Sequence, residues 1–138
     1  MERALGRRLI LGAAAAGLLL RLAFGLFYWT GKPLTHDEHE YLALAQGVSE
    51  GRGLHYPPGY ETGTSPQFGR APGYPAFLAA IGAGSDPAAT AAPGRIKVVQ
   101  AALGALVVWM IGLIALRAAG ERAGVIAAAI AACYPPLV

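Results

Sequence analysis

The chain has 138 residues and a net charge of +3, with 55% hydrophobic and 14% charged residues and a mean hydropathy of +0.46. Soluble domains carry about 25% charged residues, so this composition excludes an ordinary small soluble domain and indicates a protein whose solvent is the lipid bilayer. The arginines lie mainly beside apolar runs, which favours a role in membrane orientation over a nucleic-acid-binding surface. The single cysteine, Cys133, lies in an apolar run, so we expect a packed thiol and no disulfide within the chain.

The first predicted element is a transmembrane helix over 9–29. It follows three N-terminal arginines and is apolar except for Arg21, and its length at 1.5 Å per residue covers the ~30 Å hydrocarbon core of a bilayer. It is longer than the ~7 to 15 apolar residues of a secretory signal peptide, so we expect the chain to retain it. The basic start predicts a cytoplasmic N-terminus, and Arg21 needs a polar partner on another helix or a route to water.

Residues 30–94 hold most of the chain's ten prolines and form the predicted extracytoplasmic loop. Near 37–50, apolar residues recur at helical spacing, which predicts a helix that lies along the membrane surface and ends at Gly51 and Gly53. Ala43 falls outside its apolar stripe, whose members are Tyr41, Leu42, Leu44, Ala45 and Val48.

The apolar stretch 72–84 can be interpreted in two ways. It is short for a span, which favours a helix in the membrane interface or a re-entrant segment. The positive-inside rule supports this choice, because it leaves Arg117 and Arg122 in the cytoplasm, whereas a spanning 72–84 would place them outside. We then expect a second span over 96–116.

A third span is predicted over 123–138, where the C-terminus of the chain cuts it off. The fold class is therefore all-α: an integral membrane helical protein, with residues 1–138 as a single truncated membrane domain and surface helices near 37–50 and 72–84. The predicted location is the cell membrane, with several passes.

The densest polar cluster runs from Thr35 to Glu40, just after the first span. A carboxylate at the lip of a membrane cavity, such as that of Asp37, can act as a general base toward a hydroxyl. Thr35 and Glu38 also have the spacing of a helix capping box, which accounts for the cluster without catalysis. Metal ligation by His36, His39 and the neighbouring carboxylates lacks a diagnostic framework, so a divalent metal is not favoured.

Arg70 begins a proline-rich run, 70–75, that returns the loop to the membrane. Each proline fixes a bend, so the run predicts a guanidinium at headgroup depth. Its planar fork suits a lipid phosphate; the alternative is a general interfacial contact with anionic lipid.

In their order along the chain, these features resemble the N-terminal part of the polytopic glycosyltransferases of the C superfamily, of the protein-O-mannosyltransferase and aminoarabinose-transferase type. In that family a first span is followed by an acidic pair and a tyrosine in a surface helix, here Asp37-Glu38 and Tyr41. A basic residue with prolines and a tyrosine comes next, here the run from Arg70 with Tyr74. A span, a basic turn and a further span complete the resemblance over nearly the whole chain.

The resemblance implies an inverting transferase that moves a sugar from a polyprenyl-phosphate donor to an acceptor hydroxyl on the extracytoplasmic side. It implies Asp37 as the catalytic base, Glu38 as a second acid, Arg70 facing the donor phosphate, and Tyr41 and Tyr74 as substrate-binding residues. No cofactor is implied, and the partners are the lipid-linked donor, the bilayer and an acceptor of open identity. Members of the family are several times longer, so we expect an N-terminal fragment that is inactive by itself.

A second interpretation stays open, in which the chain is a small non-catalytic membrane protein or a subunit of a larger assembly. The capping role of the acidic cluster is compatible with it. A transporter fragment is disfavoured, because the spans hold few polar groups.

Overall fold

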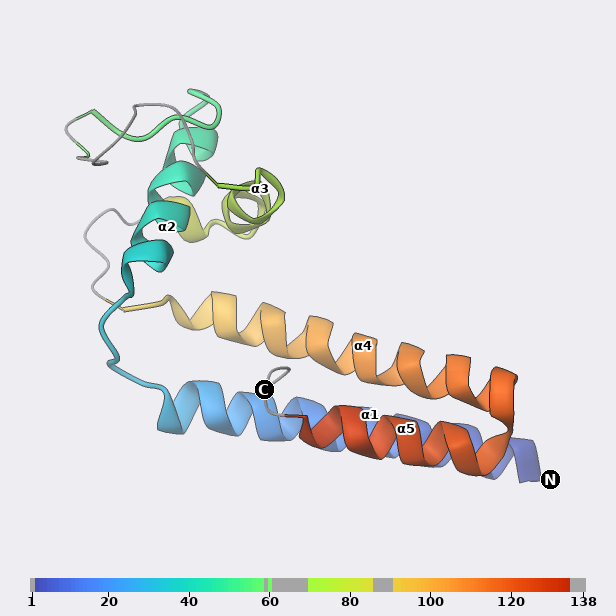
Figure 1. Ribbon diagram of the computed structural model, residues 1–138. Helices are drawn as coiled ribbons and strands as arrows, with labels where there is room; N and C mark the ends of the chain where they lie inside the picture. Colours follow the sequence, from blue (N-terminus) through green and yellow to red (C-terminus); the bar gives the residue numbers. More distant parts are fainter. Residues whose placement is uncertain (1, 59, 61–69, 86–90, 135–138) are drawn as a thin grey trace. The chain divides into compact units, whose positions relative to one another are not determined.

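The computed structural model describes residues 2–58, 60, 70–85 and 91–134. Within these ranges the chain forms five α-helices and two short helical turns, and no β-sheet (Figure 1). The all-α prediction is therefore confirmed for the part of the chain that is described.

The chain, expected to form one membrane domain, divides into two compact units. The helical unit comprises 1–30 and 97–138, and the loop unit comprises 31–96. The candidate site residues all belong to the loop unit.

Two helical stretches are long and apolar enough to cross a membrane. The first is Ala4–Tyr28, made of α1 (Glu2–Ala23) and a π-helical turn, Phe24–Tyr28; the second is α4 (Gly94–Ala119). The expected spans 9–29 and 96–116 lie within these two stretches, apart from Trp29, which follows the end of the first. In the region of the truncated third span expected over 123–138, α5 is helical from Glu121 to Cys133, and 135–138 lie outside the described residues. Its 13 residues fall short of the ~17 to 25 of a complete span.

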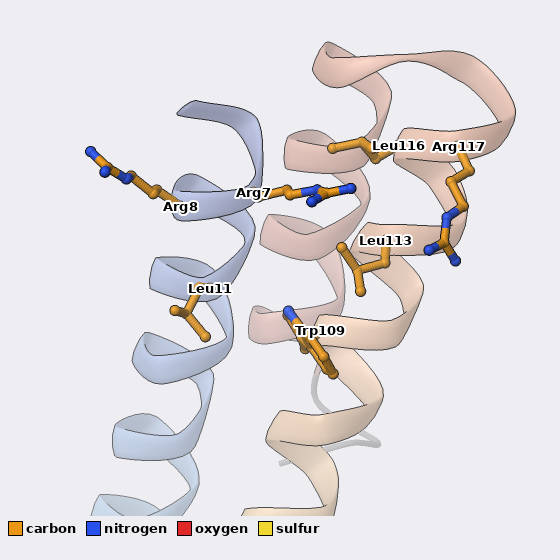
Figure 2. Close-up of a pocket in the computed structure, with 7 residues that line it drawn as sticks. All are labelled: Arg7, Arg8, Leu11, Trp109, Leu113, Leu116 and Arg117. Carbon is orange, nitrogen blue, oxygen red and sulfur yellow. The ribbon is translucent and has the colours of Figure 1, made fainter. Parts of the chain in front are cut away.

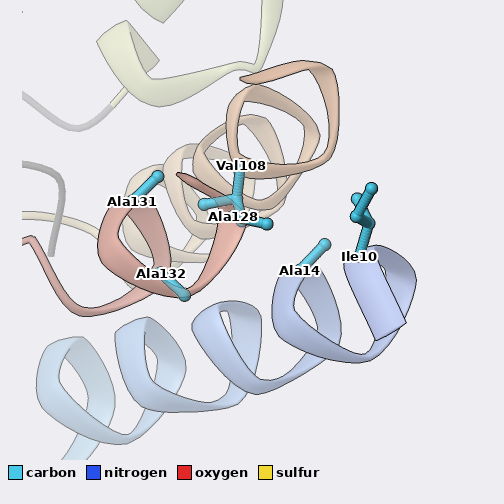
Figure 3. Close-up of a cluster of buried hydrophobic side chains, with 6 residues drawn as sticks. All are labelled: Ile10, Ala14, Val108, Ala128, Ala131 and Ala132. Carbon is cyan, nitrogen blue, oxygen red and sulfur yellow. The ribbon is translucent and has the colours of Figure 1, made fainter. Parts of the chain in front are cut away.

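The helical unit is packed through small side chains. Its buried cluster joins α1, α4 and α5 (Figure 3) and consists of Ile10, Ala14, Val108, Ala128, Ala131 and Ala132. Gly112 of α4 lies where the three helices meet, since a Cβ added there would be 2.5 Å from Ile10 Cγ2 and 3.0 Å from Ala128 Cβ. Small residues at such points let helix backbones approach closely, which is how helices associate in lipid.

Arg21 is buried inside this bundle, with 4% of its surface exposed. Its guanidinium donates to the carbonyl of Gly17 at 2.8 Å and to those of Ala131 and Ala132, both at 3.3 Å. The last four carbonyls of a helix have no partner within that helix and carry its negative dipole end. The charge of Arg21 is thus matched by the C-terminus of α5, and the expected partner on another helix is confirmed.

Cys133 is exposed in the structure, so the prediction of a packed thiol is wrong. The last turn of α5 directs Ala131 and Ala132 into the bundle. Successive helical residues are rotated by about 100°, so the next position turns away from the buried stripe. The sequence showed an apolar run there but not which of its faces would be covered.

The loop unit is built from α2 (His36–Ser49), α3 (Gly73–Ala80) and a 3₁₀ turn, Ala83–Ser85. The helix expected over 72–84 is thus shorter, at 8 residues, which at 1.5 Å per residue cannot cross a bilayer. A second hydrophobic cluster holds the unit together: Ala45, Leu78, Ala83 and Ile96.

The buried face of α2 differs from the expected stripe. Ala43 and Gly47 are buried, whereas Val48 is only half-buried. The cause is a second covering segment, because the backbone carbonyl of His55 lies directly against Gly47 and leaves no room for a Cβ. The helical periodicity of α2 alone does not predict this contact between Gly47 and His55.

The predicted end of α2 at Gly51 is confirmed. Gly51 has φ +76°, a conformation that glycine adopts without strain. The amide of Arg52 donates to the carbonyl of Gly47 at 2.9 Å, and that of Gly51 to Val48 at 3.1 Å. These two bonds form a Schellman motif, which satisfies carbonyls at the helix C-terminus.

Candidate functional site

The site begins at the N-terminus of α2, where Thr35 caps the helix. The Thr35 hydroxyl accepts a hydrogen bond from the amide of Glu38 at 3.3 Å, and the Glu38 carboxylate accepts one from the amide of Thr35 at 2.6 Å. This reciprocal pair is a capping box, and it satisfies two amides that the helix itself leaves without partners. The capping interpretation of the Thr-x-x-Glu spacing is therefore confirmed.

Asp37 and Glu40 lie one turn apart on α2 and both contact Arg70. The Arg70 Nε donates to Glu40 Oε2 at 2.6 Å, and its Nη2 donates to Asp37 Oδ1. Residues spaced by three on a helix share one face, so α2 presents two carboxylates to a single guanidinium. The structure thus brings Asp37 and Arg70 together across 33 positions of sequence.

The two carboxylates differ in exposure. The side chain of Glu40 is 13% exposed, while that of Asp37 is 61% exposed and that of Arg70 is 29% exposed. Ion pairs in contact with water contribute about 0 to 1 kcal/mol, and hydrogen bonds to charged groups away from water contribute more. Glu40 is therefore the firm anchor of Arg70, and Asp37 is the partner that is easily exchanged.

Arg70 keeps its charge in this setting. The hydrogen bond to Glu40, supported by the negative charges of Asp37 and Glu40, raises the pKa of Arg70 above its ordinary value, against a smaller opposing effect of desolvation. Among the described residues, its Nη1 has no hydrogen-bond partner. A planar guanidinium with one free nitrogen can accept a further oxygen ligand.

Two tyrosines lie beside the guanidinium. Arg70 Cζ is 5.7 Å from the centroid of the Tyr41 ring, within the ~6 Å range of a cation–π contact. The Tyr74 ring meets Tyr41 edge-on, with centroids 5.1 Å apart and an interplanar angle of 86°. Tyr74 comes from α3, so the aromatic pair joins both helices of the loop unit next to the charges.

Tyr60 is a further polar group near Glu40. Partial burial and then the negative charge of Glu40 raise its pKa above the ordinary 10.0, with a smaller contribution from Tyr56. The rings of Tyr56 and Tyr60 stack with centroids 5.1 Å apart and 5° between their planes. At neutral pH Tyr60 is therefore a phenol with a proton to donate.

Of the predicted site residues, the structure brings Asp37, Arg70, Tyr41 and Tyr74 together, and it places the Glu38 carboxylate on the helix cap. Glu40 and Tyr60 were not predicted as site residues. The three-residue spacing of Asp37 and Glu40 is a signal that can identify Glu40 from sequence. For Tyr60 the sequence offers no such signal, since its place depends on the fold of the loop.

Metal ligation has no support in the described part of the chain. No three side chains of His, Cys, Asp or Glu converge there in a way that holds a metal ion. His36 Nε2 instead lies 3.3 Å from Glu40 Oε1, one turn along α2.

Comparison of the chain with protein-family models, with curated proteins and with solved structures found no match.

Proposed function

We propose that this chain is the N-terminal part of a membrane glycosyltransferase, which moves a sugar from a polyprenyl-phosphate donor to an acceptor hydroxyl on the extracytoplasmic side of the cell membrane. The observation that carries the proposal is the joint contact of Arg70 with Asp37 and Glu40. A carboxylate and a guanidinium are the two groups that such a transfer needs, and the loop unit holds them in contact.

Arg70 binds the donor phosphate. Glu40 retains Nε, while Nη1 and Nη2 meet two phosphate oxygens in the bidentate geometry that guanidinium groups favour. The phosphate displaces the exposed Asp37 from Nη2, since that ion pair is the weaker of the two. Donor binding thereby releases the Asp37 carboxylate to act as a base.

The reaction is a single displacement at the anomeric carbon. Asp37 takes the proton of the acceptor hydroxyl, and the acceptor oxygen forms a bond to the anomeric carbon. The bond from that carbon to the phosphate oxygen breaks, and its electron pair leaves on the polyprenyl phosphate. Arg70 stabilises this charge as it develops. Glu38 takes no part in this step, because its carboxylate accepts the hydrogen bond that caps α2.

The proposed membrane placement has the N-terminus in the cytoplasm and α1 and α4 as spans. Arg7 and Arg8 of α1 line one pocket together with Arg117 of α4, so basic residues gather at one end of the helical unit. The positive-inside rule assigns that end to the cytoplasm. The opposite ends of both spans then lead to the loop unit, on the outside.

A second candidate function is that of a non-catalytic membrane protein or subunit. The observation favouring it is that Arg70, Asp37 and Glu40 satisfy one another within the chain. In that case the cluster fastens the segment at Arg70 to α2 and has no substrate.

Sugar transfer from labelled polyprenyl-phosphate sugars, in membranes that contain the full-length gene product, tests the two candidates. A general base contributes about 100- to 10,000-fold to a rate, so Asp37→Asn is expected to lower transfer by at least 100-fold with insertion unchanged. Glu50→Gln removes the same charge at the other end of α2 and serves as the matched control. Normal transfer by Asp37→Asn overturns the catalytic proposal.

Arg70→Gln separates the roles further. We expect it to raise the KM for the lipid donor as well as to lower kcat, because the phosphate loses its ligand both in the bound ground state and in the transition state. A loss of thermal stability with no transfer by the unaltered protein to any tested acceptor supports the non-catalytic candidate.

A further inference from the structure

A pocket of about 380 Å³ lies in the helical unit, and none of its lining residues belongs to the candidate site. It is lined by residues of α1 and α4 at the end where Arg7 and Arg117 are found (Figure 2). This size is within the ~300 to 1,000 Å³ of small-molecule sites.

The lining of the pocket is divided between charge and hydrocarbon. Its charged members are Arg7, Arg8 and Arg117, and all three side chains are exposed. Among the described residues, none of these arginines forms an ion pair. The guanidinium groups therefore lack a counter-ion from the part of the chain that is described.

The remaining lining is apolar. Trp109, Leu113 and Leu116 come from α4, and Leu11 faces the pocket from α1. Figure 2 shows the Leu113 side chain nearer to Arg117 and the Trp109 ring further along α4, as expected for residues about one and two helical turns away. Trp109 is 39% exposed and Leu11 is 59% exposed, so this surface is accessible to a ligand.

We propose that this pocket binds one anionic phospholipid, with its phosphate against Arg7 and Arg117 and its acyl chains along Trp109 and Leu113. The inference rests on the proposed membrane placement of the helices and not on glycosyl transfer. Basic pockets between membrane helices on the cytoplasmic side are sites of this kind. A zwitterionic lipid is disfavoured, because it also brings a positively charged ammonium group to the arginines of the pocket. Only one carboxylate with a described side chain, that of Glu121, belongs to the same end of the unit, where it packs on Gly6.

Tryptophan fluorescence tests the site directly. The chain has two tryptophans, so Trp29→Phe leaves Trp109 as the single reporter. The protein is placed in phosphatidylcholine vesicles that contain the same minor fraction of either brominated phosphatidylglycerol or brominated phosphatidylcholine. We expect the phosphatidylglycerol to quench Trp109 more strongly than its share of the lipid accounts for, while the phosphatidylcholine does not.

Single arginine variants then locate the headgroup. Arg7→Gln and Arg117→Gln are each expected to weaken the preference for phosphatidylglycerol about fivefold. Arg122→Gln removes the same charge in α5, outside the pocket, and is expected to leave the preference intact. Quenching by brominated phosphatidylcholine checks that each variant is still inserted.

Four results overturn the proposal. Equal quenching by the two lipids contradicts the lipid site but is compatible with the membrane placement. No quenching by either lipid contradicts the membrane placement as well. An equal loss of preference in Arg122→Gln and Arg117→Gln assigns it to general surface charge. Inorganic phosphate in excess should not abolish the preference, because it lacks acyl chains; if it does, the site takes a soluble anion instead.

Discussion

Glu40 and Arg70 are joined by a 2.6 Å hydrogen bond across 30 positions of sequence, and Glu40 is the less exposed of the two carboxylates on that guanidinium. The bond fixes the start of the segment that leads into α3 against the first turns of α2. It thus connects the two helices of the loop unit by charge, next to the hydrophobic cluster around Leu78.

Glu40→Gln is expected to destabilise the loop unit by about 1 to 2 kcal/mol, because a charged hydrogen bond with little exposure is lost. Asp37→Asn removes an exposed ion pair and should cost less than about 1 kcal/mol. Hydrogen exchange of the α2 amides measures both. Equal costs for the two variants would contradict the assignment of Glu40 as the anchor.

Glu38→Gln is expected to leave the start of α2 intact, since glutamine also completes a capping box. Thr35→Ala should cost about 1 kcal/mol, as the loss of an N-cap oxygen does. The exchange rates of amides 36–39 report the difference. If Glu38→Gln abolishes sugar transfer in the full-length protein while α2 is unchanged, Glu38 has a chemical role that its contacts do not reveal.

Gly112→Ala is expected to destabilise the helical unit by about 1 to 3 kcal/mol, because the added methyl group meets Ile10 and Ala128 in a packed core. Gly12→Ala provides the matched control, since a Cβ there meets nothing within 4 Å. Thermal unfolding in detergent compares the two. A similar loss of stability in both would mean that crowding at Gly112 is not the cause.

Tyr60 makes the stability of the loop unit depend on pH in the alkaline range. Its pKa is raised in the folded state, so the folded chain holds the phenolic proton more tightly than the unfolded chain does. This contribution is complete below the unfolded value of about 10 and is lost as the pH rises through the folded pKa. Tyr60→Phe should flatten the fall in melting temperature between pH 9 and about 12, and an equally steep fall in that variant would contradict the assignment to Tyr60.

Much of the architecture can be predicted from sequence because it depends on local signals. Long apolar runs indicate α1 and α4, and the Thr-x-x-Glu spacing and Gly51 mark the two ends of α2. The length of the run at 72–84 was already too short for a span. These features follow from helix geometry and turn chemistry within a few residues.

The contacts that build the site are of a different kind. Arg70 reaches Glu40 only because the intervening loop returns to α2, and no local pattern determines that return. The burial of Gly47 under His55 and the exposure of Cys133 likewise depend on which segment covers a given helix face. The pairing of Arg21 lies between these cases, since its need for a partner was evident but the carbonyls of α5 were not.

The hydrogen bonds of Arg21 have a consequence for biogenesis. In the proposed bilayer placement, α1 and α4 are long enough to leave the translocon as independent helices, although an arginine within a span costs up to about 2.5 to 3.5 kcal/mol there. The shorter α5 brings the carbonyls of Ala131 and Ala132 into the same region, where bare peptide groups are not tolerated. The charge of Arg21 in α1 and the carbonyls at the end of α5 thus satisfy each other. We therefore expect α5 to enter the membrane only by assembling onto an α1 that is already inserted.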